Sequence, residues 1–285
     1  MQARETRLAQ TSHCRAAGQV VAAVVASGFF LTGCGRGAVG PSEDATQSAA
    51  AAESGYASPP LALAARRTAV GLAIQGRSDP NARVRLSSPD GEAFGATADA
   101  QGAWSIMLPA SDTVRLFGLS EVLGARVVQG GGYLAVLPGL GRPAVLLRAG
   151  GGTEVFGSAQ GPPQITVVDY DAGGGAVICG VARPDEAIRL TMDGASAGEA
   201  RSDDGGRFSI PLAGLIKAGD HRAAVQSGSG QQSEVDFSVG GAAPITGLPY
   251  RGARPGGYWR IDWLTPGGGR QTTLVIDPAD GRRTP

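Results

Sequence analysis

The stretch Gly76–Leu108, GRSDPNARVRLSSPDGEAFGATADAQGAWSIML, decides the fold of this chain because it occurs twice. The second occurrence, Gly180–Leu212, reads GVARPDEAIRLTMDGASAGEARSDDGGRFSIPL. The two stretches align without a gap at a shift of 104 residues, and 11 of the 33 positions are identical. A fixed internal period of this kind indicates a duplicated structural unit. The same shift also aligns three residues upstream in each copy: Pro59, Leu61 and Leu63 with Pro163, Ile165 and Val167.

Apolar and polar residues alternate within each copy. Val84 and Leu86 alternate with arginines, and Trp104, Ile106 and Leu108 alternate with Ser105 and Met107. This period of two is typical of antiparallel strands with one buried face and one solvated face. Turn-forming sequences separate the alternating segments: Ser88–Gly91, Asp99–Gly102, Asp193–Gly194 and Asp203–Gly206. Short strands at such spacing predict an all-β fold of two β-sandwiches.

Both copies continue beyond the aligned block. The first ends in a predicted hairpin from Gly132 to Leu147, with its bend at Pro138–Gly139. A similar pattern runs from Gly257 to Ile276, with its bend at Pro266–Gly269. We therefore expect the second hairpin to repeat the first.

The repeated pattern resembles bacterial Ig-like and carboxypeptidase-regulatory-like modules. In those families a Gly and a Pro precede a strand, and Asp-x-x-Gly leads into an aromatic-Ser-apolar strand. Here these positions are Gly76, Pro80, Asp99, Gly102 and Trp104, and the second copy retains most of them. The resemblance implies two tandem Ig-like antiparallel β-sandwich domains. It implies no particular function, because such modules serve as spacers, adhesion units and binding domains.

The N-terminus has the pattern of a secretory signal. Arginines at positions 4, 7 and 15 precede an apolar run from Val20 to Leu31, which is too short to span a bilayer as a stable helix. The run ends in Leu31-Thr32-Gly33-Cys34, which resembles the lipobox of bacterial lipoproteins. The resemblance implies cleavage before Cys34 and acylation of this cysteine, which would then bind membrane lipid. An uncleaved anchor, or an ordinary signal with a chance cysteine, is the alternative.

These patterns predict four segments: a lipoprotein signal peptide (1–33), a lipidated flexible tether (34–58), a first sandwich (59–152) and a second sandwich with a C-terminal hairpin (153–285). The tether is rich in Gly, Ala and Ser and has too few apolar residues to fold. The residue after Cys34 is Gly35, whereas an Asp there resembles an inner-membrane retention signal. We therefore expect an envelope protein, lipid-anchored in the outer membrane if the source is Gram-negative.

Composition excludes several classes of function. The chain has 25 basic and 25 acidic residues, so no basic excess suits it to nucleic acid. Its three cysteines are Cys14, Cys34 and Cys179, and the mature chain would keep only Cys179 unmodified, which we expect to be a buried, inert thiol. With the signal removed, His221 is the only histidine, so no His/Cys zinc site is expected. We predict no enzyme, no cofactor and no metal.

The acidic turns at Asp99 and Asp203–Asp204 have two interpretations. They are either calcium-binding loops or turns capped by an aspartate that accepts backbone N–H bonds. Each turn has only one or two carboxylates, which favours the capped turn.

The C-terminal hairpin is the strongest candidate for a ligand or partner surface. Trp259 and Trp263 alternate with Tyr258, Arg260 and Asp262. Tryptophans beside an Arg/Asp pair can stack on sugar rings or anchor a protein interface. The competing interpretation is that the hairpin closes the second sandwich and buries both tryptophans.

Two functions follow from the sequence. The first is a non-catalytic envelope lipoprotein that acts as a structural, adhesive or assembly component and contacts another envelope protein. The alternative is a carbohydrate- or peptidoglycan-binding lipoprotein that uses the hairpin aromatics. The burial of Trp259 and Trp263 separates them.

Overall fold

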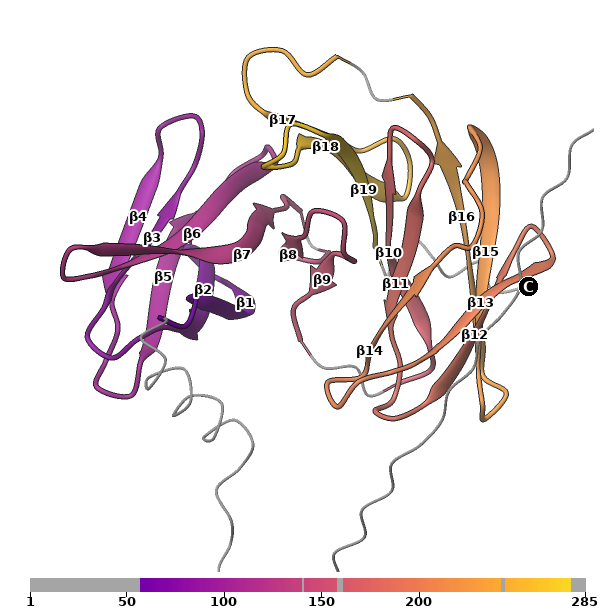
Figure 1. The fold of residues 1–285 in the computed structure, drawn as a ribbon, viewed down its shortest axis with the longest axis horizontal. Helices are drawn as coiled ribbons and strands as arrows, with labels where there is room; N and C mark the ends of the chain where they lie inside the picture. Colours follow the sequence, from indigo (N-terminus) through magenta and orange to yellow (C-terminus); the bar gives the residue numbers. More distant parts are fainter. Residues whose placement is uncertain (1–56, 140, 158–160, 242–243, 278–285) are drawn as a thin grey trace, which may run out of the picture. The chain divides into compact units, whose positions relative to one another are not determined.

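A computed structural model describes residues 57–139, 141–157, 161–241 and 244–277. This part of the chain is all-β, with antiparallel sheets built from strands β1 to β19 (Figure 1). Among these residues, no helix has the length and apolar character needed to cross a membrane. The predicted signal peptide and all but the last two residues of the predicted tether lie outside the described residues.

The first copy is an Ig-like sandwich of two sheets. Sheet A has the order β1-β2-β5, and sheet B has the order β4-β3-β6-β7-β8-β9. The strands are β1 (Leu61–Thr68), β2 (Gly71–Arg77), β3 (Arg83–Ser87), β4 (Ala93–Thr97), β5 (Ala103–Pro109), β6 (Arg115–Leu123), β7 (Arg126–Val136), β8 (Ala144–Leu147) and β9 (Glu154–Val155). β9 pairs with β8 beyond the predicted domain boundary at residue 152, and this boundary stays a prediction.

The second copy repeats this arrangement of two sheets. Sheet C has the order β14-β11-β10-β19-β18-β17, and sheet D has the order β13-β12-β15-β16. The strands are β10 (Gln164–Asp171), β11 (Ala176–Val181), β12 (Ala187–Met192), β13 (Ala195–Arg201), β14 (Arg207–Pro211), β15 (Gly219–Ser227), β16 (Gln232–Val239), β17 (Tyr250–Ala253), β18 (Tyr258–Leu264) and β19 (Arg270–Ile276). The predicted fold class of two Ig-like antiparallel sandwiches is therefore confirmed.

The glycines shared by the two copies have a packing reason. A side chain on Gly76 would collide with the ring of Trp104 and the carbonyl of Leu61. A side chain on Gly180 would collide in the same way with the ring of Phe208. The aromatic ring of β5 or β14 thus packs directly against the backbone of the glycine. This contact explains why both copies keep a glycine and an aromatic residue at these two positions.

The alignment of the first strands is wrong by one residue. The shift of 104 places Leu61 on Ile165, but Ala62 pairs with Gly76 whereas Ile165 pairs with Gly180. Both strands contain a bulge at the same place just after this point, and the correct shift in β1 and β10 is 103 residues, because the turn before β11 is one residue longer than the turn before β2. A slip of one residue exchanges the two faces of a strand, so it changes which residues are buried.

The two C-terminal hairpins also differ from the expected repetition. β8 pairs with β7 and extends sheet B, whereas β19 pairs with β10 and extends sheet C. In the first copy the added strands therefore widen the four-stranded sheet, and in the second copy they widen the three-stranded sheet. The bends at Pro138–Gly139 and Pro266–Gly269 are as predicted, but the hairpins are not equivalent.

Three apolar cores lie between successive sheets. All described residues fall within one compact unit, Glu43–Pro285. Two of the cores fill the sandwiches, one between sheets A and B and one between sheets C and D. The third is shared by the copies: it joins Leu116, Leu137 and Leu147 of the first copy to Ile261 and Trp263 of the second. Sheets B and C therefore each bury apolar residues on both faces, and the copies are docked through this shared core.

Candidate functional site

The two faces of β18 point into different cores. Trp259, Ile261 and Trp263 belong to the core shared by the copies, whereas Tyr258 packs against the core of the second sandwich. The predicted alternation along this hairpin is confirmed. Most residues on both faces of β18 are buried or half-buried. The strand therefore does not present an open ligand-binding surface.

Trp263 is completely buried, with a relative exposure of 0%. Its ring meets the ring of Tyr133 edge-on, with centroids 6.0 Å apart, so it joins the two copies directly. The indole Nε1–H donates a hydrogen bond of 3.2 Å to the hydroxyl of Thr273. The structure therefore corrects the proposed ligand surface: Trp263 is a core residue and is not accessible to a ligand.

Trp259 and Tyr258 are half-buried. The guanidinium of Arg254 lies 5.7 Å from the ring centroid of Trp259, and it also forms an ion pair of 3.3 Å with Asp277. The hydroxyl of Tyr258 accepts a hydrogen bond from the backbone N–H of Ser238. Both aromatic rings are thus tied to neighbouring segments of the second copy.

Arg260 and Asp262 form an internal ion pair. The guanidinium donates to the Asp262 carboxylate at 3.0 Å and to the carbonyl of Gly240 at 3.1 Å. The hydroxyl of Thr272 also donates to Asp262, at 2.6 Å. Burial opposes the charge on Arg260, but the bonds to Asp262 raise the pKa of the guanidinium. Since Asp262 is buried and engaged by Arg260 and Thr272, the pair neutralises a buried charge within sheet C and is not presented to a ligand.

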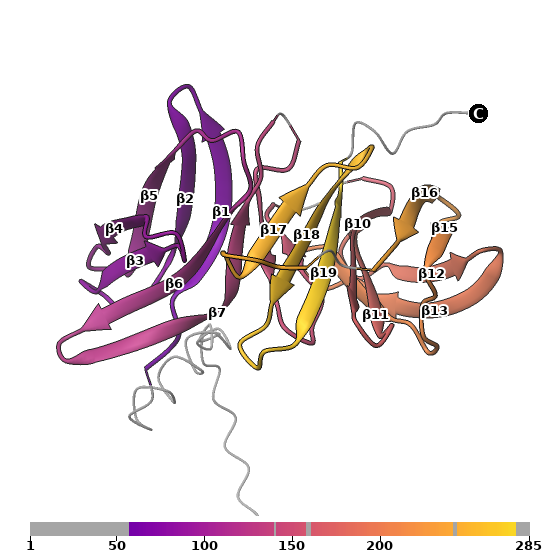
Figure 2. The same cartoon turned by 90° about the horizontal axis from the view of Figure 1, so that it is seen from above.

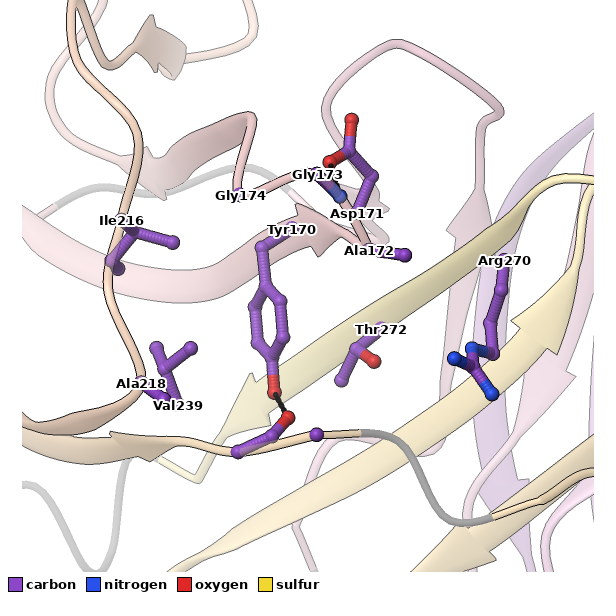
Figure 3. A pocket seen from close by; sticks show the side chains of 12 residues that line it. Tyr170, Asp171, Ala172, Gly173, Gly174, Ile216, Ala218, Val239, Arg270 and Thr272 are labelled. Atoms are coloured by element: carbon purple, nitrogen blue, oxygen red, sulfur yellow. Dashed lines mark hydrogen bonds between the residues drawn. The ribbon is translucent and has the colours of Figure 1, made fainter.

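A pocket of about 260 Å³ lies beside this ion pair (Figure 3). Ile216 and Val239 line one side of the pocket, and Arg270 lies on the opposite side. The Tyr170 hydroxyl donates to the carbonyl of Gly240 at 3.3 Å, and the Thr272 hydroxyl already donates to Asp262. The buried polar groups of the pocket are therefore engaged with the protein itself.

Sequence reasoning missed a buried carboxylate at the junction of the copies. Asp169 accepts hydrogen bonds from the backbone N–H of Thr153 at 2.6 Å, the Thr153 hydroxyl at 2.9 Å and the Thr273 hydroxyl at 2.5 Å. Burial raises the pKa of Asp169 to about 6, although these bonds lower it. The only signal in the sequence is an Asp inside an otherwise apolar strand, Ile165–Tyr170.

Cys179 lies close to this carboxylate. Burial, together with the charge of Asp169, raises the pKa of the thiol to about 12. A thiol with such a pKa is protonated at neutral pH and is a poor nucleophile. The prediction that Cys179 is buried is confirmed, and its low reactivity stays a prediction.

His221 does not form a catalytic arrangement with a hydroxyl nucleophile. Its Nδ1 lies 2.8 Å from the carboxylate of Asp193, and its Nε2 lies 2.8 Å from the carbonyl oxygen of Lys217. Both partners only accept hydrogen bonds, so both contacts form together only when the ring is an imidazolium. Burial opposes this charge, but the two hydrogen bonds raise the pKa of His221 above its usual value.

The acidic turns are capped as predicted. The carboxylate of Asp99 accepts the backbone N–H of Gln101 and of Ala103, and that of Asp203 accepts the N–H of Arg207. In the part of the chain that the structure describes, no group of three or more His, Cys, Asp or Glu side chains could hold a metal ion. The lipobox residues Leu31, Thr32, Gly33 and Cys34 lie outside the described residues.

No family model matches the chain, and no curated protein matches it significantly. Among solved structures, the central fibronectin-III array of RIM-binding protein is similar, with a TM-score of 0.24, 13% identity, and coverage of 76% of this chain and 88% of that chain. The BSP domain of a biofilm-associated protein is also similar, with a TM-score of 0.22 and 14% identity. That match covers 65% of this chain and only 30% of the other. Neither similarity is close enough to say what this chain binds.

Proposed function

We propose that this protein is a non-catalytic lipoprotein of the bacterial cell envelope, in which two docked sandwiches form a structural or assembly component. The N-terminal anchor rests on the sequence Leu31–Cys34 after a basic and then apolar segment. Acyl chains at Cys34 would hold the chain at a membrane, since each buried methylene contributes about 0.8 kcal/mol. Because Gly35, and not an Asp, follows Cys34, we expect the anchor in the outer membrane if the source is Gram-negative.

The observation that carries the structural role is the core shared by the two copies. Val114, Leu116, Val145, Trp263 and Val275 all belong to it and are buried. Sandwiches joined by a flexible link keep independent cores, whereas these two bury apolar side chains against each other. A docked pair of this kind holds its outer surfaces at a fixed separation, which suits a spacer or a scaffold for a partner protein of the envelope.

The carbohydrate-binding alternative loses one of its three aromatic side chains, because Trp263 is inaccessible, and its Asp262 is engaged with Arg260. Only Trp259 and Tyr258 remain partly exposed. We therefore retain glycan binding only as an outcome of the experiments.

The anchor is tested by expressing the full chain with its own signal and comparing it with Cys34→Ala. We expect the mature N-terminus at Cys34, a mass increased by acyl groups, and recovery in the membrane fraction. The variant should be uncleaved at this position and carry no acyl group. A mature chain that begins elsewhere, or an unmodified Cys34, would refute the anchor.

The structural role is tested in cells by cross-linking with the full-length protein, followed by mass spectrometry of the captured chains. We expect one or a few envelope proteins captured by wild type, and equally by the Trp259→Ala variant. A peptidoglycan or polysaccharide pull-down that depends on Trp259 would instead favour the binding alternative.

A further inference from the structure

The turn between β6 and β7 is surrounded by exposed apolar side chains. Leu123 is 40% exposed and Val127 is 61% exposed, while Val122 and Val128 are half-buried. Val122 and Val127 face each other across the hairpin. The end of this hairpin therefore presents an apolar tip, which we define as residues Val122–Val128.

The second copy shows that the sandwich does not require this tip. The register of the strands aligns Ser120 with Gln226, since Arg85 pairs with Ser120 where Arg189 pairs with Gln226. Gln226 pairs with Gln232 as Ser120 pairs with Gln129, and the second hairpin closes directly through the polar turn Ser227–Gln231, SGSGQ. The second sandwich thus closes this hairpin with a shorter, polar turn, so the longer apolar tip of the first copy has another cause.

The tip lies near the place where the chain enters the first sandwich. The carbonyl oxygen of Pro60 is a direct neighbour of Gly130 on β7, and β1 begins at the next residue, Leu61. From Gly130 to the turn at Arg126 is four residues, or roughly 14 Å along an extended strand. Figure 1 and Figure 2 both show the end of the β6–β7 hairpin extending past β3 and β4 of the same sheet.

We propose that this apolar tip contacts the lipid surface to which the chain is anchored. This inference rests on the proposed acylation of Cys34. Cys34 precedes Ser58 by 24 residues in the sequence, so acyl chains at Cys34 would keep the first sandwich within a limited distance of the bilayer. The tip contains no acidic residue, which suits a surface of lipid phosphates.

The physical role of the contact is orientation. The acyl chains provide the attachment, and they hold the tip at a high effective concentration beside the membrane. Burial of Leu123 and Val127 at the boundary of headgroups and acyl chains then selects one orientation of the sandwiches. The second copy, whose equivalent turn is polar, would face away from the lipid.

The test uses the full-length acylated protein on vesicles of phosphatidylethanolamine and phosphatidylglycerol. An environment-sensitive fluorophore is attached at Val127→Cys, and the control carries it at Gln232→Cys, an exposed position beside the turn of the corresponding hairpin in the second copy. Cys179 is buried and stays unlabelled in the folded protein. We expect the probe at position 127 to shift its emission to shorter wavelengths and to lose intensity when the acyl chains are brominated, whereas the probe at position 232 should do neither. Leu123→Asn should reduce both effects at position 127.

The alternative outcomes are distinct. If the acylated protein binds vesicles and both probes report water, the inference fails and the anchor stands. A probe at position 127 that is shielded but not quenched by brominated lipid would indicate a protein contact, which also overturns the inference. An unacylated chain would overturn the proposed anchor and the inference with it.

Discussion

Asp169 should make the stability of this protein depend on pH, and Asp169→Asn should remove the dependence. The carboxylate is buried between the copies, and its hydrogen-bond partners are neutral groups of Thr153, Gln271 and Thr273. Burial raises its pKa from the ordinary value of 3.8 to about 6. Since one pKa unit corresponds to about 1.4 kcal/mol, the ionised form destabilises the folded state by roughly 3 kcal/mol relative to the protonated form.

The sign follows from proton binding. Between pH 4 and pH 6 the folded protein holds a proton on Asp169 that the unfolded chain has released. The contribution of this residue to stability is therefore complete below about pH 4 and is lost as the pH rises through about 6. The neutral amide that Asp169→Asn introduces cannot ionise, so the variant should lack this loss.

The assay is denaturant unfolding of both proteins between pH 4 and pH 7.5, followed by tryptophan fluorescence. The free energy of unfolding of wild type, measured relative to the variant, should fall by roughly 3 kcal/mol over this range. Asp171→Asn is the matched control, since it removes an exposed carboxylate two residues along the same strand. Parallel stability curves for wild type and Asp169→Asn would refute the reasoning.

Three further results are expected. Trp263→Ala should lower the free energy of unfolding by about 3–5 kcal/mol, because it leaves a cavity in the core between the copies; a loss below about 1 kcal/mol in denaturant titration would contradict a shared core. The contacts of His221 with Asp193 and Lys217 should stabilise the fold fully below pH 6.5, and this stabilisation should be lost as the pH rises through the raised pKa of His221. The thermal stability of wild type should therefore fall over this range, whereas that of His221→Gln should not. Cys179 should not react with a thiol reagent in the native protein at pH 8 and should react rapidly in denaturant; fast native labelling would show that the thiol is accessible.

The strands of both copies were predictable because their signals are local. Alternation of apolar residues, as at Val84–Leu86 and Trp104–Leu108, predicts which face is buried without knowledge of the partner sheet. The turns at Asp99 and Asp203 were predictable for the same reason, since a carboxylate caps the N–H groups that follow it within four residues. The alignment of β1 with β10 failed because the turn that follows is one residue longer in the second copy, and the ungapped shift of 104 does not allow for this difference.

The sequence by itself determined the duplication, the sandwich fold and the alternation of the C-terminal hairpin. It also supplies the only indication of a lipid anchor, at Cys34. The tertiary structure alone decided that β19 joins β10 and that Trp263 lies between the copies. The physical reason is that an apolar strand face indicates burial against other residues, but the sequence pattern does not identify those residues. Asp169 follows the same rule, because its partner Thr273 lies on the neighbouring strand β19, about a hundred positions away in the sequence.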